Sequence, residues 1–305
     1  MNAVTFPNRS SVPSTIVNGL SVDVEDWFQV GAFEDVIERD DWDGLADRVD
    51  RNVKAILDLF DEVDAKATFF TLGWVARRHG ALLREIAARG HELASHGWDH
   101  RRVYRMDRES FGEDVERAQK AIEDAAGLRV TGYRAPSFSI DQRTPWALTE
   151  LAERGYAYSS SVAPIEHDHY GWAEAPRFAF KPIPWSPLIE IPVTTAMFAG
   201  KRLAAGGGGF FRVLPYAFSR WAIRQVNRRE QRPAVFYFHP WEIDPGQPRV
   251  GGAPLRSRLR HYSNLAGMAP KLRQLIHEFA WGRMDLLAYR EAARLEAEAA
   301  RAPLP

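Results

Sequence analysis

The chain of 305 residues contains no cysteine. This absence excludes disulfide bonds, thiolate metal sites and cysteine nucleophiles together. It does not identify the compartment in which the protein works. Any catalytic chemistry has to come from other side chains.

Long apolar runs are also absent. No stretch of about 18 apolar residues occurs, so we expect no membrane-spanning helix. The N-terminus, MNAVTFPNRSSVPSTIVNGL, lacks a basic start followed by an apolar segment, so we expect no secretory signal. We therefore expect a soluble cytoplasmic protein in which residues 1–15 form an N-terminal extension.

The chain lacks an excess of charge of either sign. Its 40 basic residues balance its 40 acidic residues, so no overall field attracts nucleic acid or anionic lipid. The local basic segment RRVYR at 101–105 is typical of ordinary surface. With 45% apolar residues, the chain is long enough for one large domain or two smaller ones.

Short apolar segments that alternate with helical patterns predict a parallel α/β architecture. In TIVNGLSVDV, Leu20, Val22 and Val24 alternate with Ser21 and Asp23, which predicts the first strand. Further strands are expected within residues 66–72, 91–97, 130–138, 156–162, 187–194 and 234–243.

Helical patterns lie between these strands. Residues 43–61 carry an apolar stripe from Leu45 to Phe60, and a second helix ends at Gly90. A third helix begins after Asp107, a residue suited to an N-cap, and ends at Gly127. Other helices are expected within residues 145–155 and 215–229, and residues 284–305 are expected to form a terminal helix with a frayed tail.

These elements form at least six βα units without a convincing linker. We therefore expect a single barrel-like α/β domain over residues 16–285, followed by a C-terminal helix and tail at 286–305. The run of four glycines at 206–209 lacks a following Gly-Lys-Ser/Thr, so it does not predict a phosphate-binding loop. We expect it to form a mobile or lid-like loop.

Polar residues gather at the predicted strand ends, which is where barrel enzymes place their active sites. Three carboxylates, Asp23, Glu25 and Asp26, lie within four positions although like charges repel each other. The ends of later strands carry His96 and His100, then Arg134, and finally His239.

His96 and His100 are four residues apart in ASHGWDH, a spacing that brings both rings to one side of a helical turn. With one carboxylate they form a two-histidine, one-carboxylate metal site that leaves coordination positions open. The alternative is two surface histidines with no shared function. Their position after a strand, together with the carboxylates, favours the metal site.

Arg134 and His239 each allow two interpretations. Arg134 can hold a carboxylate in a fixed geometry and keep it ionised, or it can form a purely structural salt bridge. His239 ends the apolar segment AVFYF and could be an uncharged core histidine. Pro240 and Trp241 end that strand at once, however, which places the ring at a rim where it can act as a general acid.

These motifs resemble those of the polysaccharide deacetylases with a NodB-type domain, carbohydrate esterase family 4. The resemblance rests on DVED at 23–26, the pair His96 and His100, Arg134 with Pro136, and His239. It covers roughly residues 16–245 and implies a distorted (β/α) barrel with fewer than eight complete units. The segment from GGGGFF to RHYSNL is similar to a subgroup associated with exopolysaccharide and exosortase (PEP-CTERM) loci.

The first motif departs from the family pattern, because the chain has D-V-E-D-W where relatives have T-F-D-D-G. Alignment of the final pair makes Glu25 the base and Asp26 the metal ligand. Alignment from the strand makes Asp23 the base, with Glu25 or Asp26 on the metal. We favour Asp23 as base and Asp26 as ligand, with Glu25 as the substitute. Relatives also often carry an aspartate where this chain has Ser159, and a serine does not supply that charge.

The resemblance implies a metal-dependent hydrolase that acts on carbon–nitrogen bonds other than peptide bonds and removes N-acetyl groups from the amino sugars of a polysaccharide or its precursor. A divalent ion, Zn²⁺ by preference, would bind Asp26, His96 and His100. Asp23, held by Arg134, would be the base, and His239 would protonate the leaving amine. The resemblance also allows association with a polysaccharide assembly complex. Candidate substrate contacts are Trp98, Pro136, Trp241 and, among the other tryptophans, Trp172 and Trp185.

Two other functions are compatible with the same residues. An allantoinase-like enzyme would hydrolyse a small cyclic amide on this fold. A non-catalytic carbohydrate-binding protein would need no water activation, so the complete set of acid, base and ligands is evidence against it. A retaining glycosidase is disfavoured, because such enzymes use two carboxylates about 5 Å apart and need no histidine pair.

Overall fold

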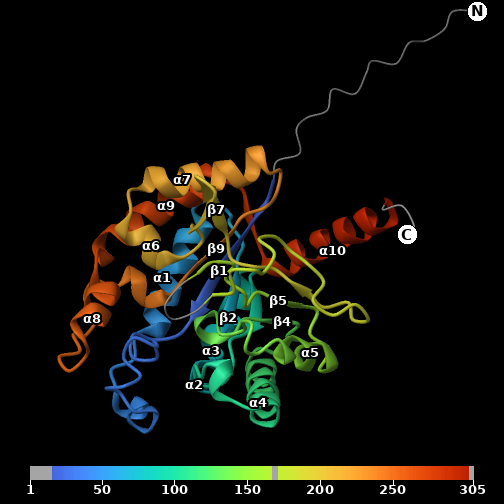
Figure 1. Ribbon diagram of the computed structural model, residues 1–305. Coiled ribbons are helices and arrows are strands. Elements are labelled where there is room, and N and C mark those ends of the chain that lie inside the picture. Colours follow the sequence, from blue (N-terminus) through green and yellow to red (C-terminus); the bar gives the residue numbers. More distant parts are fainter. Residues whose placement is uncertain (1–15, 167–170, 302–305) are drawn as a thin grey trace, which may run out of the picture.

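The computed structural model describes residues 16–166 and 171–301. An eight-stranded sheet forms its centre, in the order β10-β1-β2-β3-β4-β5-β6, with β9 paired to β1 (Figure 1). All of these strand pairs are parallel. The strands are β1 (Asn18–Val24), β2 (Thr68–Thr71), β3 (Glu92–Ser95), β4 (Gly132–Tyr133), β5 (Tyr158–Ser159), β6 (Ile189–Glu190), β9 (Val235–Phe238) and β10 (Trp281–Gly282).

The sheet curls toward a barrel, and residues that follow β6 and β8 form backbone hydrogen bonds with β9. The amide of Thr194 donates to the carbonyl of Val235 over 3.4 Å, and the amide of Tyr237 donates to the carbonyl of Gly206 over 2.8 Å. The predicted distorted barrel with fewer than eight complete units is therefore confirmed.

Helices surround the sheet (Figure 1). They are α1 (Val49–Asp61), α2 (Gly73–Arg78), α3 (Gly80–Ala88), α4 (Arg108–Ala126), α5 (Trp146–Glu153), α6 (Gly208–Val213), α7 (Tyr216–Arg224), α8 (Leu255–Tyr262), α9 (Met268–Glu278) and α10 (Met284–Arg301). A small antiparallel hairpin, β7 (Thr195–Phe198) and β8 (Lys201–Ala204), stands apart from the main sheet.

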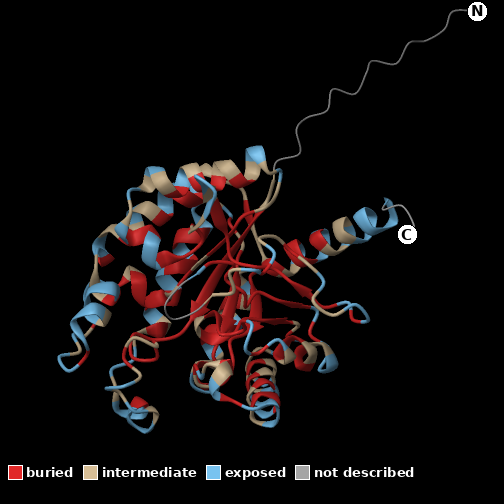
Figure 2. Cartoon of the chain, viewed as in Figure 1, coloured by how far each residue is buried: buried red, intermediate tan, exposed pale blue. Residues whose placement is uncertain are grey.

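Two apolar layers stabilise this arrangement, and Figure 2 shows the sheet almost wholly buried. Leu20 and Val22 of β1 belong to the same buried cluster as Val53 and Ile56 of α1. A second cluster joins Met284 of α10 to side chains of the sheet, including Phe70, Tyr158 and Ile189. The first turns of α10 are therefore part of the core of the barrel.

Some helix ends lie where the sequence predicts them, and others do not. Asp107 caps α4 through a bond from the amide of Ser110, and Gly127 ends it in a left-handed conformation, as predicted. The predicted helix at 43–61 begins only at Val49, and a separate 3-10 turn occupies Arg39–Gly44. The predicted lid at the glycine run is wrong in part, since Gly208 and Gly209 open helix α6.

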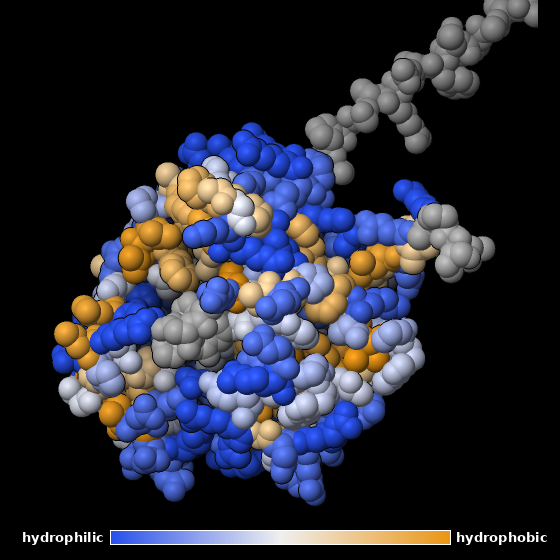
Figure 3. Space-filling view, in the orientation of Figure 1, coloured by the Kyte–Doolittle hydropathy of each residue, from blue (hydrophilic) through white to orange (hydrophobic). Residues whose placement is uncertain are grey.

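Exposed apolar side chains gather on α6 and α8, and they form orange areas at the left of Figure 3. They are Phe210, Val213, Leu255 and Leu259. Within residues 16–166 and 171–301, no helix combines the length and apolar character that a membrane span requires.

Candidate active site

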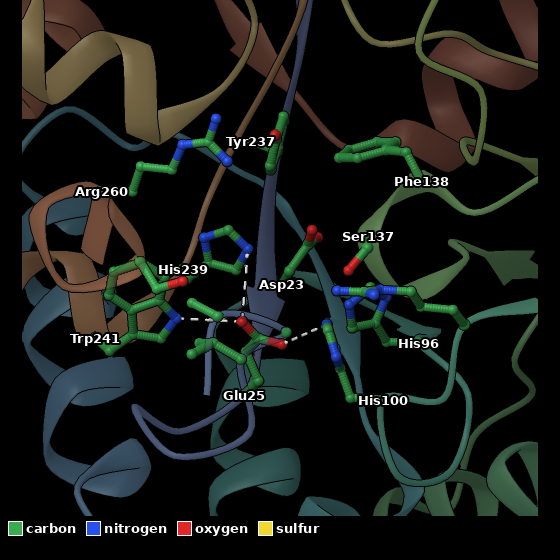
Figure 4. A pocket seen from close by; sticks show the side chains of 15 residues that line it. Asp23, Glu25, His96, His100, Ser137, Phe138, Tyr237, His239, Trp241 and Arg260 are labelled. Atoms are coloured by element: carbon green, nitrogen blue, oxygen red, sulfur yellow. Dashed lines mark hydrogen bonds and ion pairs between the residues drawn. The ribbon is translucent and has the colours of Figure 1, made fainter. Parts of the chain in front are cut away.

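A cavity of about 240 Å³ opens at the carboxyl ends of the strands (Figure 4). Asp23 and Glu25 reach it from the end of β1, His96 and His100 follow β3, and His239 follows β9. Five polar residues from three strand ends therefore converge on one site.

Glu25 occupies the centre of this cavity. Its Oε2 atom lies 3.0 Å from Nε2 of His100, and its Oε1 atom lies 3.6 Å from Nε2 of His239. The indole nitrogen of Trp241 donates to Oε1 over 3.2 Å. Burial alone would raise the pKa of Glu25, but the positive charges of His100 and His239 hold it well below its usual range. Glu25 is therefore a buried carboxylate kept in its ionised form.

The two histidines lie on a loop and not on the helical turn that their spacing predicts. Gly97 and His100 adopt left-handed conformations with φ of 75° and 59°, which turn the chain sharply after β3. Nδ1 of His96 lies 2.8 Å from the carbonyl of Arg134. A carbonyl only accepts hydrogen bonds, so Nδ1 carries the proton and Nε2 keeps a lone pair.

Burial lowers the pKa of His96 to about 4, which favours the neutral imidazole that metals bind. The rings of His96 and His100 are 5.6 Å apart between centroids. Both side chains are thus available as ligands on the same wall of the cavity.

Asp26 points away from this cavity, contrary to the prediction that it joins the histidines. Its Oδ2 atom accepts hydrogen bonds from the amides of Arg48 and Val49 at 2.6 and 3.0 Å, and Oδ1 accepts from Trp27 at 2.8 Å. Val49 is the first residue of α1. A carboxylate is favourable at a helix N-terminus, where amides lack partners. Asp26 therefore holds the start of α1.

The group that can bind a metal is Glu25, His96 and His100. One ligand atom from each lies within 4.8 Å of the others. Oε2 of Glu25 is buried, and Nε2 of His100 lies against it at 3.0 Å. Such an oxygen beside two imidazoles fits a divalent cation, because the cation would satisfy all three ligands.

Asp23 pairs with Arg134, as the sequence suggested. The guanidinium of Arg134 is fully buried and donates from Nη1 to Oδ1 of Asp23 over 2.6 Å and to Ser21 over 2.8 Å. Its Nε and Nη2 atoms donate to the carbonyl and hydroxyl of Ser160. This network fixes the carboxylate of Asp23 at the cavity wall.

Ser159 occupies the position where relatives often carry an aspartate, and a carboxylate from a neighbouring strand lies nearby. Glu190 of β6 is fully buried and accepts hydrogen bonds from the amides of Ser161 and Val162 at 2.8 and 2.9 Å. The hydroxyl of Ser161 in turn accepts the amide of Ala135, next to Arg134. Burial raises the pKa of Glu190 above its usual value, against the lowering effect of these bonds and of Arg134.

His239 stands at the edge of the cavity with 20% of its side chain exposed. Its ring stacks on Trp241 at a centroid distance of 5.1 Å and an angle of 19°. Burial would lower the pKa of His239, but the charges of Glu25 and Glu242 raise it to about 9. The ring is thus held against an aromatic wall with Nε2 toward Glu25 (Figure 4).

The predicted substrate contacts separate into two groups. Trp241 lines the cavity, whereas Trp98 and Pro136 do not. Trp98 packs against Gly73 of α2, and the guanidinium of Arg117 covers its ring at 3.6 Å. The left-handed turn at Gly97 directs Trp98 toward α2 and α4, so this prediction is wrong. Pro136 is buried at the start of a short 3-10 turn.

Several residues that line the cavity were not predicted from the sequence. Tyr237 precedes His239 by two positions, so strand periodicity could have identified it. The others follow from tertiary structure, because they come from loops and from α8. The missed lining residues include Tyr237, Phe138, Ser137, Arg102, Ser257 and Arg260.

Comparisons with known proteins divide the chain into two parts. Residues 40–158 match the family model described as polysaccharide deacetylase. Residues 160–288 match a domain of unknown function, DUF3473.

Curated relatives match over short segments. The peptidoglycan-N-acetylglucosamine deacetylase PgdA of Listeria monocytogenes is 28% identical over 88 residues, which are 29% of this chain and 19% of that protein. The chitooligosaccharide deacetylase of Rhizobium leguminosarum bv. trifolii is 36% identical over 70 residues, which are 23% of this chain and 33% of that protein. The chain thus spans about a fifth to a third of the length of these relatives.

Solved structures share the fold over a larger part of the chain. A putative polysaccharide deacetylase from Mycobacterium smegmatis superposes with a TM-score of 0.61 at 22% identity and covers 96% of both chains. The Puue allantoinase superposes with a TM-score of 0.54 at 17% identity and covers 79% of this chain and 72% of its own. At these identities the likeness concerns the fold. Residues 40–158 of this chain are therefore similar in sequence to the polysaccharide deacetylase family, and the chain shares the fold of solved structures that carry that name.

Proposed function

We propose that this protein is a metal-dependent hydrolase that removes N-acetyl groups from the amino sugars of a polysaccharide or its precursor. The observation that carries the proposal is the arrangement around one cavity of three metal-type ligands, an arginine-held aspartate and a rim histidine. The family match of residues 40–158 supports the same conclusion.

In this proposal Glu25, His96 and His100 hold the metal, and Asp26 does not. Two imidazoles and one carboxylate suit Zn²⁺ and leave positions open for water and substrate. When bound, such an ion lowers the pKa of water and polarises the acetamide carbonyl. Glu25 thereby takes the role for which Asp26 was favoured from the sequence.

Two residues of the chain then carry out the two proton transfers. Asp23, held by Arg134, accepts a proton from the water that attacks the carbonyl carbon. His239, at the edge of the cavity, gives a proton from Nε2 to the amine nitrogen as the carbon–nitrogen bond breaks. The carbonyl carbon gains an oxygen and loses the amine, so the products are acetate and a free amino sugar.

We further propose that the substrate is an exopolysaccharide or its precursor and that the protein works with a polysaccharide assembly complex. The support for this is the resemblance of the segment from Gly206 to Leu265 to a subgroup associated with exopolysaccharide loci. Trp241 offers an apolar ring beside the ligands, which suits the face of a sugar.

Release of acetate from N-acetylated chitooligosaccharides tests the proposal. We expect acetate and free amine in equal amounts, loss of both after metal chelation, and recovery after addition of Zn²⁺. Ring opening of a cyclic amide without acetate release would favour an allantoinase-like enzyme. Binding of glycans without turnover by the metal-loaded protein would favour a carbohydrate-binding protein.

A further inference from the structure

Residues 160–288, which match a domain of unknown function, contain His239 and the groups that surround it. The carboxylate of Glu242 lies behind the ring of His239. Its Oε2 atom is 3.1 Å from Nδ1 of His239 and also accepts the amide of His239 over 2.9 Å. Nε2 is the other ring nitrogen, and it faces Glu25 and the cavity.

Glu242 is itself held by Arg212 of α6. Nε of Arg212 lies 2.7 Å from Oε1 of Glu242, and both side chains are almost completely buried. Burial alone would raise the pKa of Glu242, but Arg212 and His239 hold it at about 2. The carboxylate is therefore ionised behind the imidazole.

The remaining nitrogens of Arg212 bind backbone carbonyls at the end of α8. Nη1 donates to His261 and Ser263 over 3.0 and 2.6 Å, and Nη2 donates to Arg260 over 3.0 Å. The guanidinium group is thus held by backbone carbonyls, which, unlike side-chain acceptors, cannot change rotamer. A chain of fixed contacts runs from the end of α8 through Arg212 and Glu242 to His239.

Within the glycine run at 206–209, Gly208 leaves room for the carboxylate of Glu242 because it has no side chain. A Cβ atom on Gly208 would lie 2.1 Å from Oε2 of Glu242, whereas a Cβ atom on Gly209 would meet no described residue within 4 Å. Glu242 cannot move aside, because Arg212 and His239 hold its two oxygens. Gly208 therefore allows α6 to start directly against the carboxylate.

We propose that Glu242 is a positioning residue for the general acid His239, and that Arg212 and Gly208 keep it in place. The inference rests on the proposed deacetylase function and assigns a task to residues 160–288. Glu242 accepts a hydrogen bond from the N–H group at Nδ1 of His239, so that proton stays on the ring. The proton that His239 can give to the leaving amine is therefore the one at Nε2. Glu242 stays ionised throughout.

The dependence of the rate on the leaving group tests this role. An amine leaves only when protonated, whereas 4-nitrophenolate leaves as a stable anion and needs no acid. We expect Glu242→Gln to lower kcat on an N-acetylated chitooligosaccharide about 100-fold or more with KM unchanged. Hydrolysis of 4-nitrophenyl acetate and the bound metal should remain close to parental values. Equal losses on both substrates, or none on either, would overturn the proposal.

Neighbouring glycines supply a second, milder variant and its control. Gly208→Ala should reproduce the selective loss of Glu242→Gln, and Gly209→Ala should behave like the parent. Glu278→Gln is a further control, because Glu278 also binds an arginine, Arg224, but lies away from the cavity. Parental deacetylation by Gly208→Ala would contradict the proposed geometry.

A measurement without turnover separates this inference from the proposed function. In NMR spectra of the metal-loaded protein, the Nδ1 proton of His239, identified by its loss in His239→Ala, should be protected from exchange. It should lose that protection in Glu242→Gln. If this holds while the parent releases no acetate, the deacetylase proposal fails and the positioning of His239 stands. If the proton is equally protected in both proteins, the positioning is overturned.

Discussion

The carboxylate of Glu25 lies 3.0 Å from Nε2 of His100. It is one of three contacts through which the crowded carboxylates at the end of β1 bind different partners. Glu25 faces the histidines, Asp23 pairs with Arg134, and Asp26 binds the N-terminus of α1. The mutual repulsion expected from the sequence is avoided because each charge has its own positive or amide partner.

Substitution of the two adjacent carboxylates should separate their roles. Glu25→Gln should lose most of the bound metal, because the anionic ligand is removed from a site with two neutral imidazoles. Asp26→Asn should keep the metal but lower the free energy of unfolding by about 1 kcal/mol, because its NH2 group would replace one of the oxygens that accept hydrogen bonds from amides at and before the start of α1. Elemental analysis and urea unfolding measure these effects. Loss of metal in Asp26→Asn with full retention in Glu25→Gln would reverse the assignment.

The three histidines should fall into two classes. His96→Ala and His100→Ala should abolish metal retention and acetate release while the chain stays folded. His239→Ala should bind metal normally but turn over slowly, because it lacks the acid for the leaving amine. Metal content, circular dichroism and acetate release measured together distinguish the classes. Acetate release at the parental rate by metal-free His96→Ala or His100→Ala would refute the site.

Removal of the buried guanidinium should destabilise the protein strongly. Arg134→Met leaves Asp23 as a buried charge without its partner, and we expect a loss of about 3–5 kcal/mol in the free energy of unfolding. Arg273→Met is the matched control, because its pair with Glu62 is exposed to solvent and should contribute far less to stability. Similar losses in the two variants would mean that the Asp23–Arg134 pair does little for stability.

A carboxyl group at the opposite end of the barrel should make stability depend on pH. Glu92 accepts hydrogen bonds from Tyr158 and the amide of Asp285 and is also bonded to Thr68. Burial, followed by the charge of Asp285, raises the pKa of Glu92 to about 7 from its usual value of 4.5. The folded state therefore holds a proton that the unfolded chain releases at lower pH.

The stabilising contribution of Glu92 is complete below pH 4.5 and is lost as the pH rises to about 7. This loss amounts to about 3 kcal/mol. Glu92→Gln does not titrate, so its free energy of unfolding relative to the parent should rise over that interval. Urea unfolding of both proteins from pH 4 to pH 8 measures the difference. A difference that is constant with pH would contradict the prediction, and Glu113→Gln on the exposed face of α4 is the control.

Much of the fold followed from local patterns. The alternation in β1 predicts a strand with Asp23 on the face opposite Val22, and the cap and glycine predict both ends of α4. Strand ends in a parallel barrel meet at one edge, so Asp23, the two histidines, Arg134 and His239 could be placed together in advance. Local patterns did not reveal that α1 begins at Val49, because that start depends on a contact with Asp26.

The sequence by itself determined the absence of thiol chemistry, the α/β architecture and the set of polar strand ends. Only the tertiary structure decided which carboxylate faces the histidines, where Trp98 points and why a glycine is needed at position 208. Beyond the last residue of a strand, the period of two no longer sets the direction of a side chain. That direction depends on partners distant in the sequence, such as the amides of α1 for Asp26 and the start of α6 for Glu242.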